Sequence, residues 1–195
     1  MNKSIASSTF PVTISTPSVW MRTGGIVLTG SAFVAVCAHI ALPLFFTPVP
    51  LSMAPFAVLL LGLALSPRLA AATLAAYLVE GALGLPVFAP GPLAGFAHLI
   101  GPTAGYLLSY PFAAALISFI SRRGTRSFSS ALLGAAVGNL VILGCGALAM
   151  AVLTHASMAS VLTLAVLPFL PGDALKVIAA AALVTSFRRV RTTQA

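Results

Sequence analysis

The chain has 195 residues, of which 59% are hydrophobic and only 6% are charged. Soluble domains carry about 25% charged residues, so this composition excludes a protein whose whole surface faces water and indicates an integral membrane protein. The net charge of +8 comes from Lys and Arg residues spread thinly along the chain, without a basic cluster interleaved with aromatic residues. This pattern does not favour nucleic acid as a partner.

The N-terminal residues 1–20 are polar, rich in Ser and Thr, and lack the apolar segment of a signal peptide. We expect a disordered tail there, a single membrane domain over residues 21–190 and a C-terminal tail over residues 191–195. Within a bilayer only helices and closed barrels satisfy the backbone. Barrel strands alternate strictly between apolar and polar residues, whereas this chain has long apolar runs rich in Ala and Leu. The domain is therefore predicted to be all-α.

A membrane-spanning helix needs about 20 apolar residues, with a range of roughly 17 to 25. Proline, glycine and charged residues divide the apolar sequence into six such runs. The predicted spans cover residues 24–42, 51–65, 69–85, 103–120 and 131–153, followed by a last run that ends at Arg188 and is interrupted by Pro168 and Pro171.

Lys and Arg residues occur before the first span, between the second and third, between the fourth and fifth, and after the sixth. The other three connections, residues 43–50, 86–102 and 154–161, contain none. Basic residues favour the cytoplasmic side. We therefore predict a multi-pass protein of the inner (cytoplasmic) membrane, in contact with membrane lipid, with both termini in the cytoplasm and the uncharged connections outside.

The outer segment 86–102 is rich in Pro and Gly, yet it carries large apolar side chains such as Phe88, Phe96 and Ile100. Irregular backbone at membrane depth is tolerated where protein covers it or where it lines a cavity. We predict that this segment folds back over the bundle as an apolar outer lid. The alternative is an ordinary hairpin that rests at the membrane interface.

The chain has two acidic residues, Glu80 and Asp173. Asp173 follows Pro171 and Gly172 at a predicted helix start, and Lys176 lies three positions further on the same helix face. Charges in a bilayer cost roughly 2.5–3.5 kcal/mol, so those that persist have a partner or a task. The two residues form either a structural ion pair or the polar floor of a ligand pocket, in which Lys176 binds a carboxylate and Asp173 accepts from N–H groups.

Other polar residues leave alternatives open. Asn139, in the middle of the fifth span, either binds a ligand or bridges helices, and Glu80 is either a proton-coupling carboxylate or a tether for the following loop. His39, His98 and His155 lack the mutual spacing of a metal site. The sequence also lacks GxxxxGK[ST], HExxH and GxSxG motifs, so we expect no metal, no cofactor and no enzymatic activity.

Five motifs occur in order along the chain. They are FTPVPLSMAPF (46–56), YLVEGALGLPVFA (77–89), GPTAGYLLSYP (101–111), GNLVI (138–142) and LPFLPGDALK (167–176). Together they resemble the BioY family, the biotin-specific S components of energy-coupling-factor (ECF) transporters, over about residues 24–187. The resemblance implies a six-helix S-component bundle that captures biotin with high affinity at the outer face and releases it inward. It also implies an ECF transmembrane coupling subunit and ATPase subunits as partners.

The resemblance also suggests site residues. Asp173 and Lys176 match the family motif associated with the biotin site, Phe88 and Tyr106 are expected to cover the fused ring, and Asn139 is a further candidate for the ligand.

Two small residues of the first span, Ser31 and Ala35, match the positions where S components meet the coupling subunit. The chain departs from many relatives at Ala54, where they have Gln, and at Ala104, where they have Gly. The first departure argues against a ligand contact from the second span. The alternative function is a stand-alone proton-coupled secondary carrier for a small carboxylated solute, with Glu80 or Asp173 coupling the proton.

Overall fold

The computed structural model describes residues 17–123 and 127–193. This part of the chain forms seven α-helices, a short 3-10 helix and a two-stranded sheet. In order these are α1 (Pro17–His39), β1 (Ala41–Leu42), β2 (Leu51–Ser52), α2 (Ala54–Ala64), α3 (Pro67–Ala82), η1 (Gly95–Leu99), α4 (Ala104–Arg123), α5 (Phe128–Thr154), α6 (Met158–Ala165) and α7 (Leu170–Thr193). The expectation of a helical protein is confirmed, with the small sheet as an addition.

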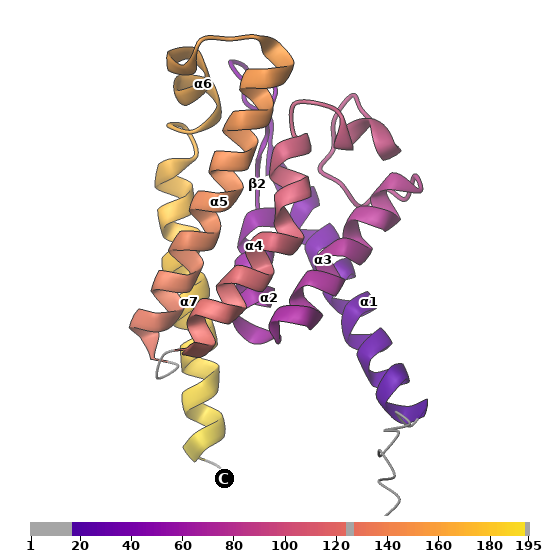
Figure 1. Cartoon of the computed structure of the whole chain (residues 1–195), viewed down its shortest axis with the longest axis vertical. Helices are drawn as coiled ribbons and strands as arrows, with labels where there is room; N and C mark the ends of the chain where they lie inside the picture. Colours follow the sequence, from indigo (N-terminus) through magenta and orange to yellow (C-terminus); the bar gives the residue numbers. More distant parts are fainter. Residues whose placement is uncertain (1–16, 124–126, 194–195) are drawn as a thin grey trace, which may run out of the picture.

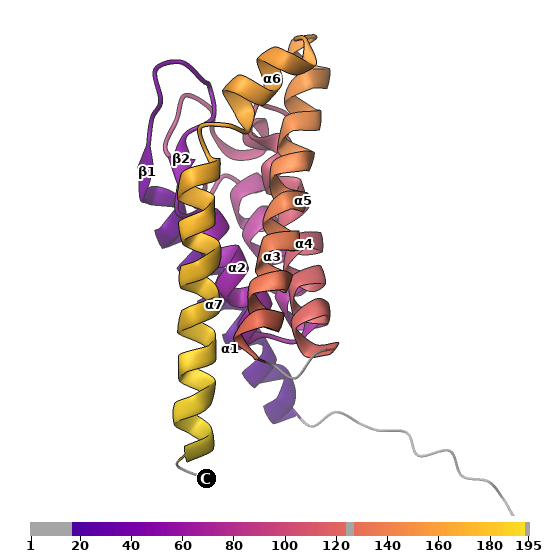
Figure 2. The ribbon, with the colours of Figure 1, turned by 90° about the vertical axis from the view of Figure 1, so that its left-hand side faces the viewer.

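The long helices run lengthwise in one bundle, and successive ones point in opposite directions (Figure 1). One end of the bundle, here called the loop end, gathers the β1–β2 hairpin, η1 and α6 (Figures 1 and 2). The start of α1 and the end of α7 lie at the opposite end, here called the terminal end. The three connections without Lys or Arg thus lie together at the loop end.

Within the described part of the chain, four helices are long and apolar enough to cross a membrane: Val19–His39, Ala104–Arg123, Phe128–Thr154 and Leu170–Val190. The chain is thus a multi-pass membrane protein. The second and third predicted spans are shorter, because α2 has 11 residues and α3 has 16. At 1.5 Å per residue these two helices extend about 17 and 24 Å, less than the roughly 30 Å of a hydrocarbon core.

Three predicted boundaries differ from the structure. Helix α7 continues to Thr193, into the segment predicted as a C-terminal tail. Helix α1 begins at Pro17, inside the segment predicted as a tail; Pro is well suited to a first helical turn because its fixed φ is already helical. Residues 1–16 lie outside the described part of the chain. The last predicted run is divided into α6 and α7, because Pro168 lacks the N–H that would continue α6, whereas Pro171 is accommodated in the first turn of α7.

The hairpin was expected only as a loop. Its two strands pair antiparallel, with Ala41 opposite Ser52 and Leu42 opposite Leu51, and the Met53 N–H donates to the Ile40 carbonyl oxygen at 3.0 Å. Strands of two residues are too short to show the alternation that identifies a strand in sequence. Between the strands Thr47 and Val49 are buried, whereas Phe45 and Phe46 are exposed, so only the second half of the hairpin loop contributes to the interior of the bundle.

Glycines allow the helices to approach closely. A Cβ at Gly105 in α4 would collide with the Cys145 carbonyl oxygen in α5, and a Cβ at Gly138 in α5 would collide with the Ile117 side chain in α4. Small residues at such contacts let helix backbones approach. The close α4–α5 contact fixes the first turn of α4 beside the cavity described next.

Candidate ligand-binding site

A cavity lies inside the bundle beneath the loop end, and it measures about 60 Å³. Its wall combines α-helical residues with residues of the hairpin and of the segment before η1. The lining residues are Ala38, Val49, Pro50, Ser52, Ala54, Pro55, Tyr77, Phe88, Ala89, Thr103, Tyr106, Leu107, Tyr110, Ile142, Leu143, Phe169, Asp173 and Lys176. The lining is mostly apolar with few polar groups, which is typical of small-molecule sites.

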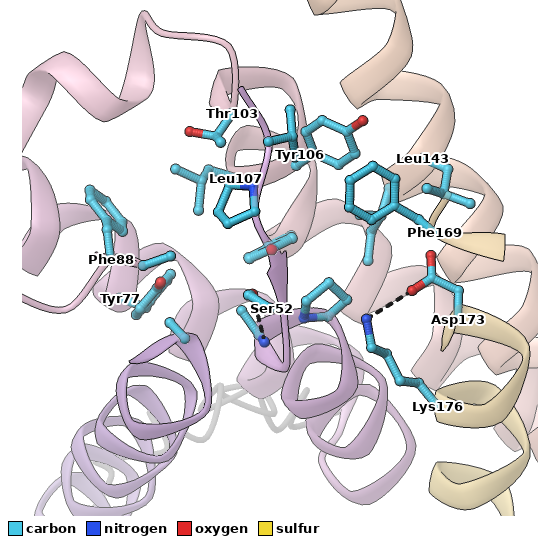
Figure 3. Close-up of a pocket in the computed structure, with 18 residues that line it drawn as sticks. Ser52, Tyr77, Phe88, Thr103, Tyr106, Leu107, Leu143, Phe169, Asp173 and Lys176 are labelled. Carbon is cyan, nitrogen blue, oxygen red and sulfur yellow. Dashed lines mark hydrogen bonds and ion pairs between the residues drawn. The ribbon is translucent and has the colours of Figure 1, made fainter. Parts of the chain in front are cut away.

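The charged part of this wall comes from α7. Asp173 lies in the first helical turn, as predicted, and the Lys176 Nζ donates to Asp173 Oδ1 at 2.9 Å. The two residues are only 4% and 7% exposed, and they lie side by side at one end of the cavity (Figure 3). A buried pair of this kind avoids the large cost of an isolated buried charge.

Asn139 reaches the same pair from α5. Its Nδ2 donates to Asp173 Oδ2 at 3.3 Å, while its Oδ1 is buried without a hydrogen-bond partner. Asn139 is not among the residues that line the cavity. Asn139 therefore bridges α5 and α7 and contacts the Asp173 carboxylate at the oxygen that Lys176 does not use, while its role toward a ligand stays a prediction.

Phe88 occupies a slot that α3 provides. A Cβ at Gly81 would collide with the Phe88 ring, so the absence of a side chain at Gly81 lets this ring lie against the helix. Phe88 is 5% exposed, and its ring meets Tyr77 edge-on with centroids 5.3 Å apart. The segment before η1 therefore folds back onto the bundle and places one aromatic residue in the cavity wall, whereas Phe96 remains exposed.

Tyr106 occupies a matching slot over α5. A Cβ at Gly146 would collide with the Tyr106 ring, and the Tyr106 hydroxyl donates to the Ala165 carbonyl oxygen at 2.6 Å. This bond ties α4 to the end of α6. The Tyr106 ring also lies 6.4 Å from the Phe169 ring, centroid to centroid. Tyr106 therefore lines the cavity, while its hydroxyl holds the end of α6 in place.

Substituting Gly146 by Ala should displace Tyr106 and lower the thermal stability of the protein, because overpacking a tight contact costs about 1–3 kcal/mol. The matched control is Gly144→Ala on the same helix, where an added Cβ meets nothing within 4 Å. Thermal unfolding of the two purified variants measures the difference. A Gly146→Ala protein as stable as the Gly144→Ala protein would show that the Tyr106 ring does not pack directly against Gly146.

The predicted residues Asp173, Lys176, Phe88 and Tyr106 thus line one cavity. Their roles toward a ligand stay predictions. Sequence reasoning did not assign Thr103, which immediately precedes α4, or Tyr110 within α4; both line the cavity with Tyr106. Tyr106 and Tyr110 are four residues apart and share one helix face, and that spacing could have identified Tyr110.

The two small residues assigned to a partner lie differently. Ser31 is buried, and its Oγ donates to the Glu80 carboxylate, at 2.7 Å from Oε1 and 2.6 Å from Oε2. Ala35 packs against the core from a half-buried position. The Ser31 side chain therefore faces α3 and does not lie on the outer face of α1. Glu80 is half-buried and is not a lining residue of the cavity.

The histidines are separate from one another. His39 Nδ1 lies 2.8 Å from the Ala35 carbonyl oxygen. The His98 ring is tilted against the Phe88 ring with centroids 5.1 Å apart, and His155 caps the end of α5 with φ 50°. Within residues 17–123 and 127–193, no three His, Cys, Asp or Glu side chains gather as metal ligands would.

Comparisons with known proteins agree with this architecture. The sequence model of the BioY family matches residues 7–193. A Pyrococcus horikoshii protein named "Probable biotin transporter BioY" is 39% identical over 129 residues, which cover 66% of this chain and 74% of that protein. A Bacillus subtilis protein of the same name is 33% identical over 161 residues, covering 78% of this chain and 81% of that one.

A Thermotoga maritima "Biotin transporter BioY" is 29% identical over 160 residues, covering 82% of this chain and 92% of that protein. Among solved structures, the "S-component for biotin from an ECF-type ABC transporter" has a TM-score of 0.80 and 24% identity, and the match covers 89% of this chain and 94% of that one. This likeness shows that the two proteins share a fold. From the family match over nearly its whole length, the chain belongs to the BioY family.

Proposed function

We propose that this protein binds biotin in the cavity beneath the loop end and acts as the high-affinity substrate-capturing S component of a biotin uptake system. The observation that carries the proposal is the buried Asp173–Lys176 pair at one end of an apolar cavity. The chain has two acidic residues, and one of them forms this buried pair beside the cavity. Charges inside a membrane protein usually have a function, so the pair fits a ligand site better than an ion pair that only helps α7 to insert into the membrane.

The chemistry of biotin suits this wall. Its sulfur-containing ring and its aliphatic chain are apolar and match the aromatic surfaces of Phe88, Tyr106 and Phe169. Its ureido group and its carboxylate are strong hydrogen-bonding groups that need buried polar partners, and Asp173 and Lys176 provide both an acceptor and donors.

The proposed orientation places the loop end outside the inner (cytoplasmic) membrane and both termini in the cytoplasm. Arg22, Arg122, Arg123, Arg188 and Arg189 lie near helix ends at the terminal end, which supports this orientation because basic residues favour the cytoplasmic side. In this arrangement the six lengthwise helices traverse the membrane, with the short α2 and α3 extended by the hairpin and by the segment around η1.

The segment 86–102 acts as the lid in this proposal. The cavity measures about 60 Å³, whereas pockets that hold drug-sized ligands measure about 300–1,000 Å³, so biotin requires the wall to move outward. Phe88 belongs to this segment, whose regular secondary structure is the short η1. Outward movement of the segment would open the cavity toward the outside.

Release into the cell requires an energy source, and the sequence contains no GxxxxGK[ST] loop for ATP. The proposed partners are an ECF transmembrane coupling subunit and ATPase subunits. Because Ser31 faces α3, the proposed contact on α1 is assigned to Ala35 together with exposed neighbours such as Phe33 and Val36.

The direct test is a titration of the purified protein with biotin, with lipoate and dethiobiotin as comparison ligands. We expect saturable binding of biotin with a Kd below about 1 μM, which corresponds to a binding free energy of about −8.2 kcal/mol or stronger. Lipoate, which has a similar tail but no ureido group, should bind much more weakly. Equal affinity for biotin and lipoate, or no binding of biotin, would contradict the proposal.

The proton-coupled alternative is tested at Glu80. Its carboxylate accepts a hydrogen bond from Ser31, and Gln at this position can still accept that bond while it cannot release a proton. We expect Glu80→Gln to retain biotin uptake in cells that contain the ATPase subunits, and to retain it when the proton gradient is collapsed. Loss of uptake in either condition, with the protein still folded, would favour the carrier.

A further inference from the structure

A groove on the side of the bundle lies next to the ligand cavity. It measures about 570 Å³ and is formed by the end of α1, the two-stranded sheet, the start of α2 and the first turns of α7; β2, α2 and α7 lie next to one another in Figure 2. Ser52 and Lys176 line both the groove and the cavity. Leu42 and Leu175 also line the groove and are 65% and 69% exposed. The groove therefore opens on the lateral surface of the bundle, which faces lipid in a membrane protein.

The part of the groove nearest the loop end has a polar backbone. Both strands of the hairpin line it, with residues 40–42 and 51–53. A Cβ at Gly172 would lie 3.8 Å from Leu51 Cδ1, so the start of α7 meets the sheet here. The open edges of a two-stranded sheet present backbone N–H and C=O groups, and such edges do not face the hydrocarbon of a bilayer. This part of the groove therefore suits a polar occupant.

The rest of the groove is apolar. Its wall follows α7 from Gly172 to Ala179, about 10 Å at 1.5 Å per residue, and leads away from the loop end (Figure 2). Leu175 and Ala179 line it from α7, and Phe56 lines it from α2. The Lys176 ammonium group beside them is already paired with Asp173. This part suits a hydrocarbon chain, so the whole groove matches a ligand with a polar head and an apolar tail.

His39 determines the charge that the polar head should carry. It is exposed, ends α1 and lines the groove. Its Nδ1 lies 2.8 Å from the Ala35 carbonyl oxygen; because a carbonyl oxygen only accepts, Nδ1 donates there, and Nε2 is the nitrogen that can donate to a ligand when the ring is protonated. The residues that line the groove include no Asp or Glu, so the head is expected to be an anion.

We propose that this groove binds one anionic phospholipid, with its phosphate beside His39 and the sheet and one acyl chain along α7 as far as Ala179. The lipid lies on the other side of Lys176 from the ligand cavity. The site goes beyond the proposed function and does not depend on biotin binding, so the two can fail separately.

The test measures the contact of single Trp residues with brominated lipids, which quench Trp fluorescence. Trp20, the one Trp of the chain, is replaced by Phe. A new Trp is placed at Leu175, or at Ile178, which is 52% exposed on the same helix and does not line the groove. Vesicles mix phosphatidylglycerol and phosphatidylcholine, with either lipid brominated. Leu175→Trp should prefer phosphatidylglycerol at least about threefold, since a basic side chain attracts anionic lipid, and Ile178→Trp by less than about 1.5-fold.

Further variants of the Leu175→Trp protein test the head and the tail separately. His39→Gln should lower the preference to that of the Ile178→Trp protein, and His39→Lys, which keeps a positive charge, should retain it. Ala179 is half-buried in the groove wall, so Ala179→Phe should fill the apolar part and abolish the preference. Ala174→Phe is the matched control, because Ala174 is exposed on α7 and does not line the groove; it should leave the preference unchanged.

Three results would overturn the proposal. An equal preference at Leu175 and Ile178 would show that the groove does not select its lipid. A preference that persists in His39→Gln would show that the phosphate does not lie beside His39. A preference that persists in Ala179→Phe would show that the acyl chain does not follow α7 to this residue.

Discussion

Replacing Lys176 by Ala will weaken biotin binding more than tenfold, a loss of at least about 1.4 kcal/mol. The Lys176 ammonium group faces the cavity and is 7% exposed, so its remaining N–H donors have little access to water and are available to the ligand. Hydrogen bonds to a charged group contribute about 1.5–3 kcal/mol. Titration of the purified variant with biotin measures the loss.

The affinity of the Lys176→Ala variant must be measured on folded protein. Removing Lys176 leaves Asp173 with the hydrogen bond from Asn139 but without its cation, so the protein should also become less stable. Affinity is therefore measured below the unfolding temperature of the variant, with Thr185→Val on the same helix as the control. Wild-type affinity in a folded Lys176→Ala protein would reduce the pair to a structural role.

Replacing Asp173 by Ala should have a larger effect on stability. It leaves Lys176 buried without its carboxylate and removes the acceptor of the Asn139 bond. Removing one partner of a buried ion pair costs about 3–5 kcal/mol. We expect a lower thermal midpoint together with loss of measurable biotin binding, by thermal unfolding with and without biotin.

The double variant Asp173→Leu/Lys176→Met separates the two roles of the pair. Apolar residues of similar volume often replace a buried ion pair without loss of stability, so this protein should regain most of the stability that Asp173→Ala loses. It should not regain biotin binding, because neither Leu nor Met forms hydrogen bonds to the polar groups of biotin. A double variant that binds biotin normally would show that the pair serves only the fold.

The Asp173–Lys176 pair also shows which contacts can be predicted from neighbouring residues in the sequence and which cannot. Pro171, Gly172 and Asp173 predict a helix start, and the spacing of three residues to Lys176 predicts one face, because both follow from the geometry of a single helix. The structure has Asp173 in the first turn of α7, paired with Lys176. The sequence does not predict the bond from Asn139 to Asp173, since this bond depends on how α5 is rotated against α7.

The same limit applies to Ser31. Its small side chain suggested a face for another protein, but a small residue suits any close helix contact, whether inside one chain or between chains. In the structure Ser31 bonds Glu80 across the α1–α3 contact. The division of the last run into α6 and α7 has a related origin, because Pro168 and Pro171 mark a break but do not define the path between the two helices.

A helical membrane protein, the alternation of its basic residues along the chain and its family can all be predicted from the amino-acid sequence. These properties follow from composition, local periodicity and motif order, which need no knowledge of contacts between distant residues. The folded bundle was needed to show that Gly81 and Gly146 receive the rings of Phe88 and Tyr106, and that the hydroxyl groups of Tyr77 and Thr103 have no hydrogen-bond partner. Such features arise where side chains far apart in sequence meet, because close packing and hydrogen-bond satisfaction are properties of the assembled bundle.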